Sequence, residues 1–312
     1  MEIFRLQYQN NDVYKKYADS LNINPENINT IETIPFLPIS FFKTHEVTTT
    51  LFKPEIIFES SGTSGDNTSR HLVKKLSIYK KSFSKAFELF YGNPEDWCIL
   101  GLLPGYLERR NSSLVLMVNE LINTSRNSVS GFYLHDHKKL YQALLHNEII
   151  KQPTLLIGVT FSLLDFAEKY SMELKHTIVM ETGGMKGKRE EMTREEVHFF
   201  LQNKLGISSV HSEYGMTELL SQAYSKEKGS FQYMPWMKVL AREYNDPFEI
   251  TSMRGVKKSA NGLLNIIDLA NLYSCCFIAT DDVGKIYANN TFEILGRRDN
   301  SDLRGCSLMT SG

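Results

Sequence analysis

The sequence of 312 residues contains 42% hydrophobic and 11% aromatic residues, enough for a sizeable hydrophobic core in one large or two medium domains. Its 35 basic and 36 acidic residues give a formal net charge of −1, which argues against a general electrostatic attraction to nucleic acid or to a membrane surface. No apolar run approaches the ~18 residues that a membrane span requires, and the four cysteines lack metal-binding spacing, so the sequence predicts a cytoplasmic protein without a membrane span.

Residues 1–55 are predicted to form an N-terminal helix and an extended arm. Pro25, Pro35, Pro38 and Pro54 interrupt any long regular element. The run at residues 34–43 is too apolar for a free linker, so we expect this arm to pack on the body of the protein.

A loop of small and hydroxyl residues follows an apolar strand at residues 56–58. Glycine allows backbone N–H groups to approach an anion closely, and serine and threonine hydroxyls add further donors. The pattern indicates a phosphate-binding loop, and the alternative is an ordinary surface turn. The loop residues are Ser60, Ser61, Gly62, Thr63, Ser64 and Gly65.

Residues 56–229 alternate between apolar runs and segments with helical periodicity, which predicts an α/β nucleotide-binding core. Strands separated by single helices are typical of a parallel sheet covered by helices on both faces, and ligands bind at the carboxyl ends of such strands. The loops at 60–65, 182–184 and 213–218 each follow a predicted strand, so we expect them to converge on one site. The predicted strands after the first loop are 98–103, 132–134, 154–159, 177–180 and 207–210.

The pattern becomes β-rich after residue 230. Runs at 237–244, 263–269, 275–280 and 285–295 have no clear helix between them, which predicts a β-rich subdomain at residues 230–296, followed by a hinge and tail at 297–312. Cys275 and Cys276 lie in one of these runs and are expected to be buried and unreactive.

Four separated segments have a fixed order: 60–65, 214–218, 280–284 and 296–299. Parts of these segments also have ordinary structural explanations. Tyr214 and Gly215 could form a simple turn, Glu218 could be an acid at a helix N-terminus, and the segment at Asp281 and Asp282 could be a hairpin turn. If these explanations and the surface turn at residues 60–65 all held, the order of the segments would be a coincidence.

In this order and spacing, the segments resemble the AMP-forming adenylating superfamily of acyl-CoA synthetases, peptide-synthetase adenylation domains and firefly luciferase. Within it, the sequence is similar to the acyl-protein synthetase family, the luciferin-component ligases of bacterial bioluminescence. That resemblance rests on residues 35–43, 181–184, 211–218 and 302–307 and covers nearly the whole chain from about residue 30. It implies the large N-terminal domain of an acyl-adenylate-forming enzyme, with the mobile C-terminal cap domain absent or truncated.

The resemblance also implies an activity. A carboxylic acid, expected to be a fatty acid, would react with ATP to give an acyl-AMP, and a thiol would then accept the acyl group. Residues 60–65 would hold the β- and γ-phosphates, Thr217 the α-phosphate and Glu218 the magnesium ion, since Mg²⁺ prefers oxygen ligands. ATP and Mg²⁺ are therefore the implied cofactors.

The nucleoside would lie beside the remaining segments. Because Asp281 stands where the family has glycine, the choice between Asp281 and Asp282 at the ribose stays open. The residues implied at the nucleoside or at its junction with the acyl group are Thr182, Gly183, Gly184, Glu213, Tyr214, Gly215, Asp282 and Arg297.

Cys306 matches the cysteine that takes the acyl group in this family before a reductase or carrier protein receives it. A neighbouring Arg304 would lower the pKa of the thiol and favour nucleophilic attack. The alternative is an unreactive cysteine near the end of the chain. A cap-domain lysine is missing after Asp299, because the last lysine is Lys285.

Two alternatives to an acyl-protein synthetase remain at this point. The first is an acyl- or aryl-CoA ligase that uses free CoA as the acceptor. The second is a non-enzymatic nucleotide-binding or scaffold subunit that lost catalysis with its cap.

Overall fold

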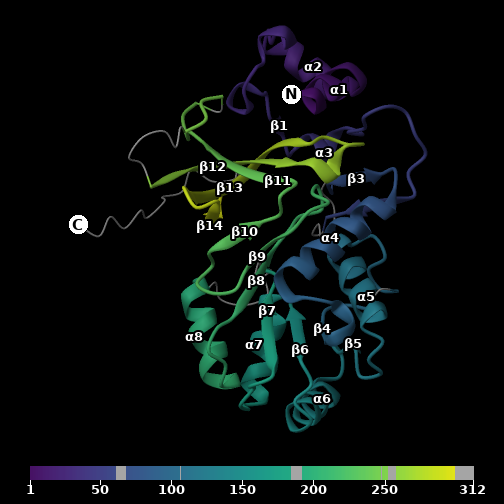
Figure 1. Cartoon of the computed structure of the whole chain (residues 1–312), viewed down its shortest axis with the longest axis vertical. Coiled ribbons are helices and arrows are strands. Elements are labelled where there is room, and N and C mark those ends of the chain that lie inside the picture. Colours follow the sequence, from purple (N-terminus) through teal and green to yellow (C-terminus); the bar gives the residue numbers. More distant parts are fainter. Residues whose placement is uncertain (61–67, 106, 184–191, 247, 252–257, 299–312) are drawn as a thin grey trace.

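The computed structural model describes residues 1–60, 68–105, 107–183, 192–246, 248–251 and 258–298. Its largest feature is a mixed sheet of twelve strands, eleven of them in the order β11-β12-β13-β14-β10-β9-β8-β7-β6-β4-β5. Helices cover the end of this sheet that contains β4 to β8, whereas the other end contains long antiparallel strands (Figure 1). The predicted α/β fold with a β-rich C-terminal part is confirmed.

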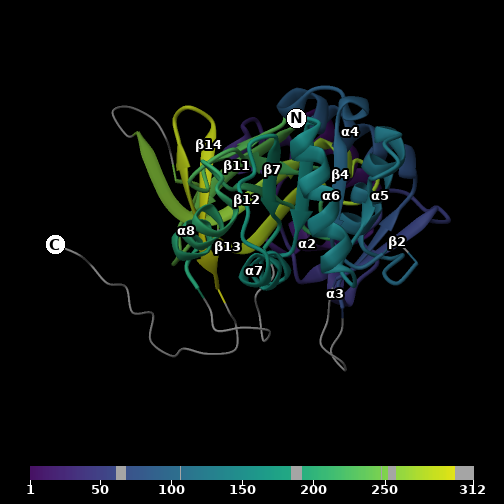
Figure 2. The ribbon, with the colours of Figure 1, turned by 90° about the horizontal axis from the view of Figure 1, so that it is seen from below.

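The parallel half of the sheet is buried on both faces, as expected for strands connected by helices. Alternate residues of one strand point into two cores: Leu155 and Ile157 pack with α4 and α5, and Leu156 packs with α6, α7 and α8. In Figure 2, α4 and α7 lie on opposite sides of β4 and β7. The strands are β4 (Cys98–Leu102), β5 (Gly131–Phe132), β6 (Thr154–Gly158), β7 (Thr177–Glu181) and β8 (His211–Tyr214). The helices are α4 (Leu76–Tyr91), α5 (Ser113–Ser125), α6 (His137–Ile149), α7 (Thr160–Lys169) and α8 (Arg194–Leu205), with a 3-10 turn at Pro94–Asp96.

One predicted strand is wrong. Residues 207–210 are not a strand, because β8 begins at His211 and pairs with β7 only at Met180↔His211 and Glu181↔Ser212. Ile207 and Val210 are apolar because they contact the core beside α8, not because they belong to the ladder. The sequence pattern could not separate these two reasons for burial.

The β-rich part continues the same sheet. β9 pairs antiparallel with β8, β10 with β9, and β14 with β10, so hydrogen bonds run without interruption from the parallel half into the antiparallel half. The strands are β9 (Ala223–Ser225), β10 (Phe231–Tyr233), β11 (Met237–Arg242), β12 (Ser259–Asp268), β13 (Phe277–Tyr287) and β14 (Thr291–Arg297), with a 3-10 turn at Leu269–Asn271.

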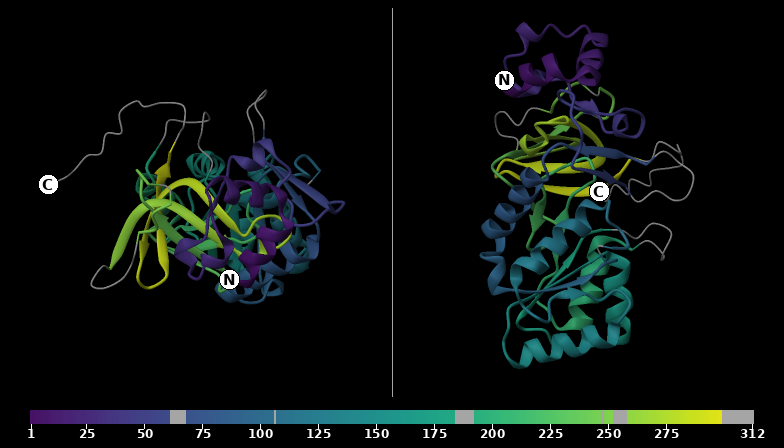
Figure 3. Two further views of the ribbon diagram at one scale, coloured as in Figure 1. Left: turned by 90° about the horizontal axis from the view of Figure 1, so that it is seen from above. Right: turned by 90° about the vertical axis from the view of Figure 1, so that its right-hand side faces the viewer.

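The N-terminal segment packs on the β-rich half, as predicted for the arm. Gln7 is fully buried and its side-chain amide donates to backbone oxygens at Asn271, Leu272 and Ser274, while the Tyr14 hydroxyl donates to the Pro35 carbonyl at 2.7 Å. Figure 3 shows these first helices at the end of the molecule away from α6. The elements are α1 (Glu2–Asn10), α2 (Asp12–Ser20), 3-10 turns at Pro25–Asn27 and Ile31–Thr33, β1 (Leu37–Pro38), which pairs with β13, and α3 (Phe41–Thr44). A separate hairpin of β2 (Ile56–Glu59) and β3 (Arg70–Val73) follows.

Candidate active site

Three predicted residues from three strands meet at the junction of the two sheet halves. The Tyr214 hydroxyl at the end of β8 donates to Asp282 Oδ2 on β13 at 2.7 Å. Arg297 on β14 lies opposite Asp282 in the strand register, and its Nε is 3.9 Å from Asp282 Oδ1. Burial raises the pKa of Asp282, and the Tyr214 hydrogen bond and the Arg297 charge oppose that rise.

Asp281 and Asp282 are both inside β13, so the hairpin-turn alternative for this segment is wrong. Successive side chains of a strand point to opposite faces. Asp282 therefore faces Tyr214, whereas Asp281 acts electrostatically on Arg242, whose pKa burial lowers to about 10.

Glu218 lies in the same neighbourhood, and its side chain is buried, with 6% exposure. Burial raises the pKa of Glu218, while a hydrogen bond from Ser69 and the charges of Arg297 and Lys43 act to lower it. Within residues 192–246 the next element after β8 is the strand β9, so the alternative of Glu218 as a helix N-terminal acid is wrong.

The segment with Thr217 and Glu218 is held in place by residues that the sequence analysis missed. The protonated Nδ1 of His71 on β3 donates to the Thr217 carbonyl at 2.9 Å, and Asn271 Nδ2 donates to the Glu218 carbonyl at 2.7 Å. Asp268 accepts from the Leu220 backbone N–H at 2.9 Å, and burial raises its pKa to about 6. No local motif marks these residues, because they act through contacts between distant segments.

Ser60 is at the end of β2, next to Ser69 on the other arm of the hairpin. Its hydroxyl accepts from the Ser69 N–H at 3.0 Å, and its own N–H donates to the Ser69 carbonyl at 3.1 Å. Ser69 in turn hydrogen-bonds Glu218, so the start of the predicted phosphate loop lies near the predicted metal ligand. Ser61, Gly62, Thr63, Ser64 and Gly65 lie outside the described residues.

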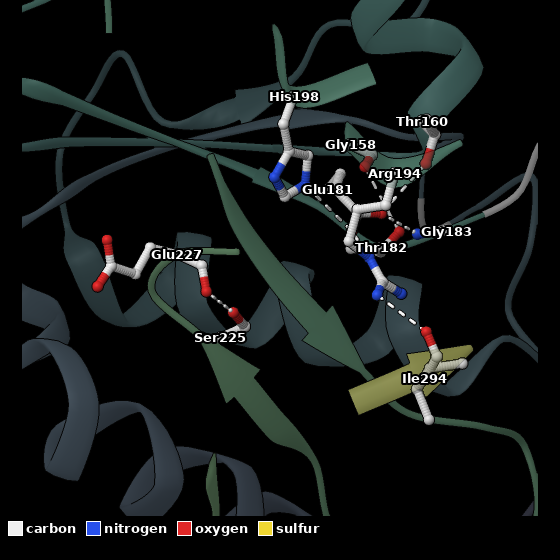
Figure 4. Close-up of polar contacts among 10 residues, drawn as sticks. All are labelled: Gly158, Thr160, Glu181, Thr182, Gly183, Arg194, His198, Ser225, Glu227 and Ile294. Carbon is white, nitrogen blue, oxygen red and sulfur yellow. Dashed lines mark hydrogen bonds and ion pairs between the residues drawn. The ribbon is translucent and has the colours of Figure 1, made fainter. Parts of the chain in front are cut away.

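Thr182 and Gly183 follow β7, as predicted. The Thr182 N–H donates to the Gly158 carbonyl at 3.1 Å, and the Gly183 carbonyl accepts from the Thr160 N–H at 3.0 Å. Gly183 has φ +71°, which glycine adopts without strain. Figure 4 shows that the Gly183 N–H also meets the carboxylate of Glu181, a residue for which the sequence analysis proposed no role. Gly184 and Cys306 lie outside the described residues.

Glu213 and Gly215 flank Tyr214. A side chain at Gly215 would come within 2.5 Å of Glu213 Oε1, so the absence of a Cβ there leaves room for the carboxyl group. Burial and the negative charge of Glu181 raise the pKa of Glu213 to about 8.

Burial also shifts the pKa of two cysteines and one histidine. Cys275 and Cys276 are fully buried, as predicted, and burial raises the pKa of both thiols. His211 is buried and contacts the Tyr91 hydroxyl at 3.1 Å, and burial together with Lys226 lowers its pKa to about 4.

Comparison with known protein families shows the family of this chain. The family model described as "Acyl-protein synthetase, LuxE" matches residues 1–312. The chain belongs to this acyl-protein synthetase family. It is therefore an enzyme of the acid–thiol ligase class, one that forms an acyl-adenylate with ATP and transfers the acyl group, which argues against the non-enzymatic alternative.

Two curated relatives are similar over most of the chain. One, named long-chain-fatty-acid--luciferin-component ligase, is from Aliivibrio fischeri and is 24% identical over 98% of this acyl-protein synthetase and 85% of the relative. The other has the same name, is from Vibrio harveyi and is 25% identical over 99% of this chain and 85% of the relative.

Solved adenylating enzymes share the fold. An open conformation of 2-hydroxyisobutyryl-CoA ligase, in complex with 2-HIB-AMP and CoA, is 11% identical, with a TM-score of 0.66 over 97% of this chain and 74% of that chain. ATP-bound MatB from Rhodopseudomonas palustris is 16% identical, with a TM-score of 0.56 over 80% of this chain, which spans 50% of the length of MatB.

Among the described residues, no helix is long and apolar enough to cross a membrane. They also contain no cluster of three or more histidine, cysteine, aspartate or glutamate side chains that could hold a metal ion without other ligands.

Proposed function

We propose that this acyl-protein synthetase activates a fatty acid with ATP and passes the acyl group through a thioester to a partner protein. The observation that carries the proposal is the meeting of Tyr214, Asp282, Arg297 and Glu218 at the carboxyl end of β8. A fatty acid is the proposed substrate because both curated relatives carry that substrate class in their names.

Asp282 would bind the ribose. A carboxylate has two acceptor oxygens, so it can accept hydrogen bonds from the ribose hydroxyls. Tyr214 already donates to Oδ2, so Oδ1, which faces Arg297, is the oxygen available to the sugar. Thr182, Gly183, Gly184, Glu213 and Gly215 would surround the adenine and the acyl junction beside Tyr214.

The phosphates would extend from Thr217 toward the loop at residues 60–65. An oxygen of the fatty acid carboxylate attacks the α-phosphorus, the bond to the bridging oxygen breaks, and pyrophosphate leaves. Glu218 suits Mg²⁺ because it is a buried carboxylate whose pKa burial raises, so a nearby cation would favour its ionised form. One protein carboxylate is enough when ATP oxygens and water complete the coordination, and the ion would neutralise the phosphate charge.

Cys306 would accept the acyl group in the second step. Its thiolate attacks the acyl carbonyl carbon, the bond to the phosphate oxygen breaks, and AMP leaves with both electrons of that bond. A second thiol on a reductase or carrier protein would then take the acyl group by thioester exchange. We further propose a cytoplasmic location, where thiols stay reduced.

Exchange of labelled pyrophosphate into ATP tests the first step. We expect exchange that depends on a fatty acid and on Mg²⁺ in the full-length protein. Absence of exchange with a panel of aliphatic and aromatic acids of different chain lengths would overturn the proposal. An Asp282→Asn variant serves as the site control, since its exchange should fall sharply.

Free CoA is the alternative acceptor. It is suggested by the 2-hydroxyisobutyryl-CoA ligase structure, whose bound ligands include CoA. Cys306→Ser separates the two: it should abolish labelling of the protein by a radioactive fatty acid, whereas formation of a CoA ester that survives the substitution would favour the CoA ligase.

A further inference from the structure

Glu181, the last residue of β7, is a buried carboxylate with 7% exposure directly behind the Gly183 turn. Its Oε2 accepts from the Gly183 N–H at 2.7 Å and from the Thr160 hydroxyl at 3.1 Å. The carboxylate therefore ties the turn after β7 to the start of α7 (Figure 4).

The other oxygen of Glu181 faces two side chains on α8. Arg194 Nε lies 4.0 Å and His198 Nε2 lies 3.9 Å from Glu181 Oε1, and among the described residues the buried His198 Nε2 has no hydrogen-bond partner. Burial acts to raise the pKa of Glu181, but His198, Ser212, the Gly183 N–H and Arg194 outweigh it, so the pKa lies below its ordinary value.

Arg194 is itself fixed in position. Its Nη1 donates to the Ile294 carbonyl on β14 at 3.0 Å, and its guanidinium lies over the Phe231 ring at 5.5 Å. A Cβ at Gly229 would come within 2.7 Å of Arg194 Nη1, so the backbone there leaves space only for this side chain. The Arg194 side chain cannot move away from Glu181 without breaking these contacts.

We propose that Glu181 is a positioning residue that holds the Gly183 turn in its nucleotide-binding conformation, with Arg194 and His198 of α8 beside its second oxygen. Gly183 has a positive φ and lies outside the strand pairing of β7. The hydrogen bond from its N–H to the Glu181 carboxylate therefore helps to set the orientation of this peptide group. An ionised acceptor makes this hydrogen bond stronger than a neutral one. The inference rests on the proposed function, because it assumes that this turn contacts ATP.

Glu148 provides a matched control at the opposite end of β7. Its carboxylate accepts from the Lys175 N–H at 2.8 Å, from the His176 N–H at 3.0 Å and from the Thr177 hydroxyl at 2.7 Å. It resembles Glu181 in accepting backbone and hydroxyl donors beside the same strand, but it lies at the amino end, away from the site.

The experiment compares Glu181→Gln and Glu148→Gln with the wild type in fatty-acid-dependent pyrophosphate exchange. Glutamine keeps the shape of Glu181 but presents a neutral acceptor to Gly183 and can turn an amide donor toward Arg194 and His198. We expect Glu181→Gln to raise the KM for ATP by about 10-fold, because a hydrogen bond to a charged acceptor is stronger than one to a neutral acceptor. Glu148→Gln should leave the KM for ATP unchanged.

A structural role alone predicts a different result. In that case both variants would lower the thermal midpoint and Glu181→Gln would leave the KM for ATP unchanged, which would overturn the inference. If the wild type shows no exchange at all, the proposed function fails instead. Calorimetric titration with ATP then decides the inference: weaker binding by Glu181→Gln alone supports it, and equal binding by all three proteins rejects it.

Discussion

The Tyr214 hydroxyl and the Asp282 carboxylate are joined by a 2.7 Å hydrogen bond across 68 residues of sequence. This bond connects the end of the parallel half of the sheet, at β8, with the long strand β13 of the antiparallel half. It can form only because β9, β10 and β14 continue one sheet between these strands. The candidate nucleotide site therefore depends on the two halves forming one continuous sheet.

Removing the Tyr214 hydroxyl should weaken ATP binding. In Tyr214→Phe, the buried Asp282 loses a hydrogen bond that lowers its pKa, so the carboxylate takes up a proton more readily and accepts ribose hydroxyls less well. We expect a roughly 5-fold to 10-fold rise in the KM for ATP in the exchange assay, the equivalent of about 1 to 1.5 kcal/mol. Tyr233→Phe is the control, because the Tyr233 hydroxyl donates to Asn290 Oδ1 at 3.3 Å and not to Asp282. An equal effect in both variants would contradict the prediction.

The two neighbouring aspartates should differ in effect. Asp282→Asn removes the charge that faces Tyr214 and Arg297, whereas Asp281→Asn removes one on the opposite face of β13. We expect Asp282→Asn to raise the Kd for ATP by ~10-fold or more, because a hydrogen bond to a charged group is worth about 1.5–3 kcal/mol, and Asp281→Asn to change it less than twofold. Calorimetric titration of both variants measures this, and a larger effect at Asp281 would reverse the assignment.

A methyl group at Gly183 should affect nucleotide binding through the backbone. None of the described residues lies within 4 Å of a Cβ added there, so the expected cost of Gly183→Ala comes from φ +71°. We expect a loss of about 1 kcal/mol in the free energy of unfolding and a several-fold rise in the KM for ATP. Gly92→Ala also places a side chain at positive φ, +83°, at the end of α4, with no described residue within 4 Å of the added Cβ. It should lose stability, measured by urea unfolding, without any change in KM.

The free energy of unfolding should fall as pH rises, because the folded chain holds a proton on Glu213. Its folded-state pKa is about 8, above its ordinary value of 4.5, so between these values the folded chain holds a proton that the unfolded chain releases. The free energy of unfolding therefore decreases with rising pH across that window and loses its dependence on Glu213 above about pH 8.

The Glu213→Gln variant tests this linkage, since glutamine resembles the protonated acid. Urea unfolding should show the variant gaining stability relative to the wild type between about pH 5 and about pH 8.5. The negative charge of Glu181 acts on Glu213, and the charge of Glu213 in turn raises the pKa of Tyr79, Tyr91 and Tyr224. A stability difference that is the same at every pH would contradict the assigned pKa.

The sequence by itself determined the α/β class and most of the strands. Continuous apolar runs such as Cys98–Leu102 and Thr154–Gly158 are buried on both faces, and local periodicity records that burial directly. The order of the motifs also determined the family, because residue types such as those at Tyr214, Glu218 and Asp282 are visible without any contact. The mistaken strand at residues 207–210 shows the limit, since burial against a helix and burial in a ladder look the same in sequence.

Tertiary structure alone decided which side chains act on one another. Asp282 rather than Asp281 faces the site because the register of β13 against β14 sets which alternate residues point inward. His71, Asp268 and Asn271 hold the segment after β8 from other parts of the chain, and Glu181 reaches Gly183 with α8 behind it. Hydrogen bonds and charge interactions act over a few ångströms in space, whereas sequence motifs record only separation along the chain, so these contacts appear only when the fold is formed.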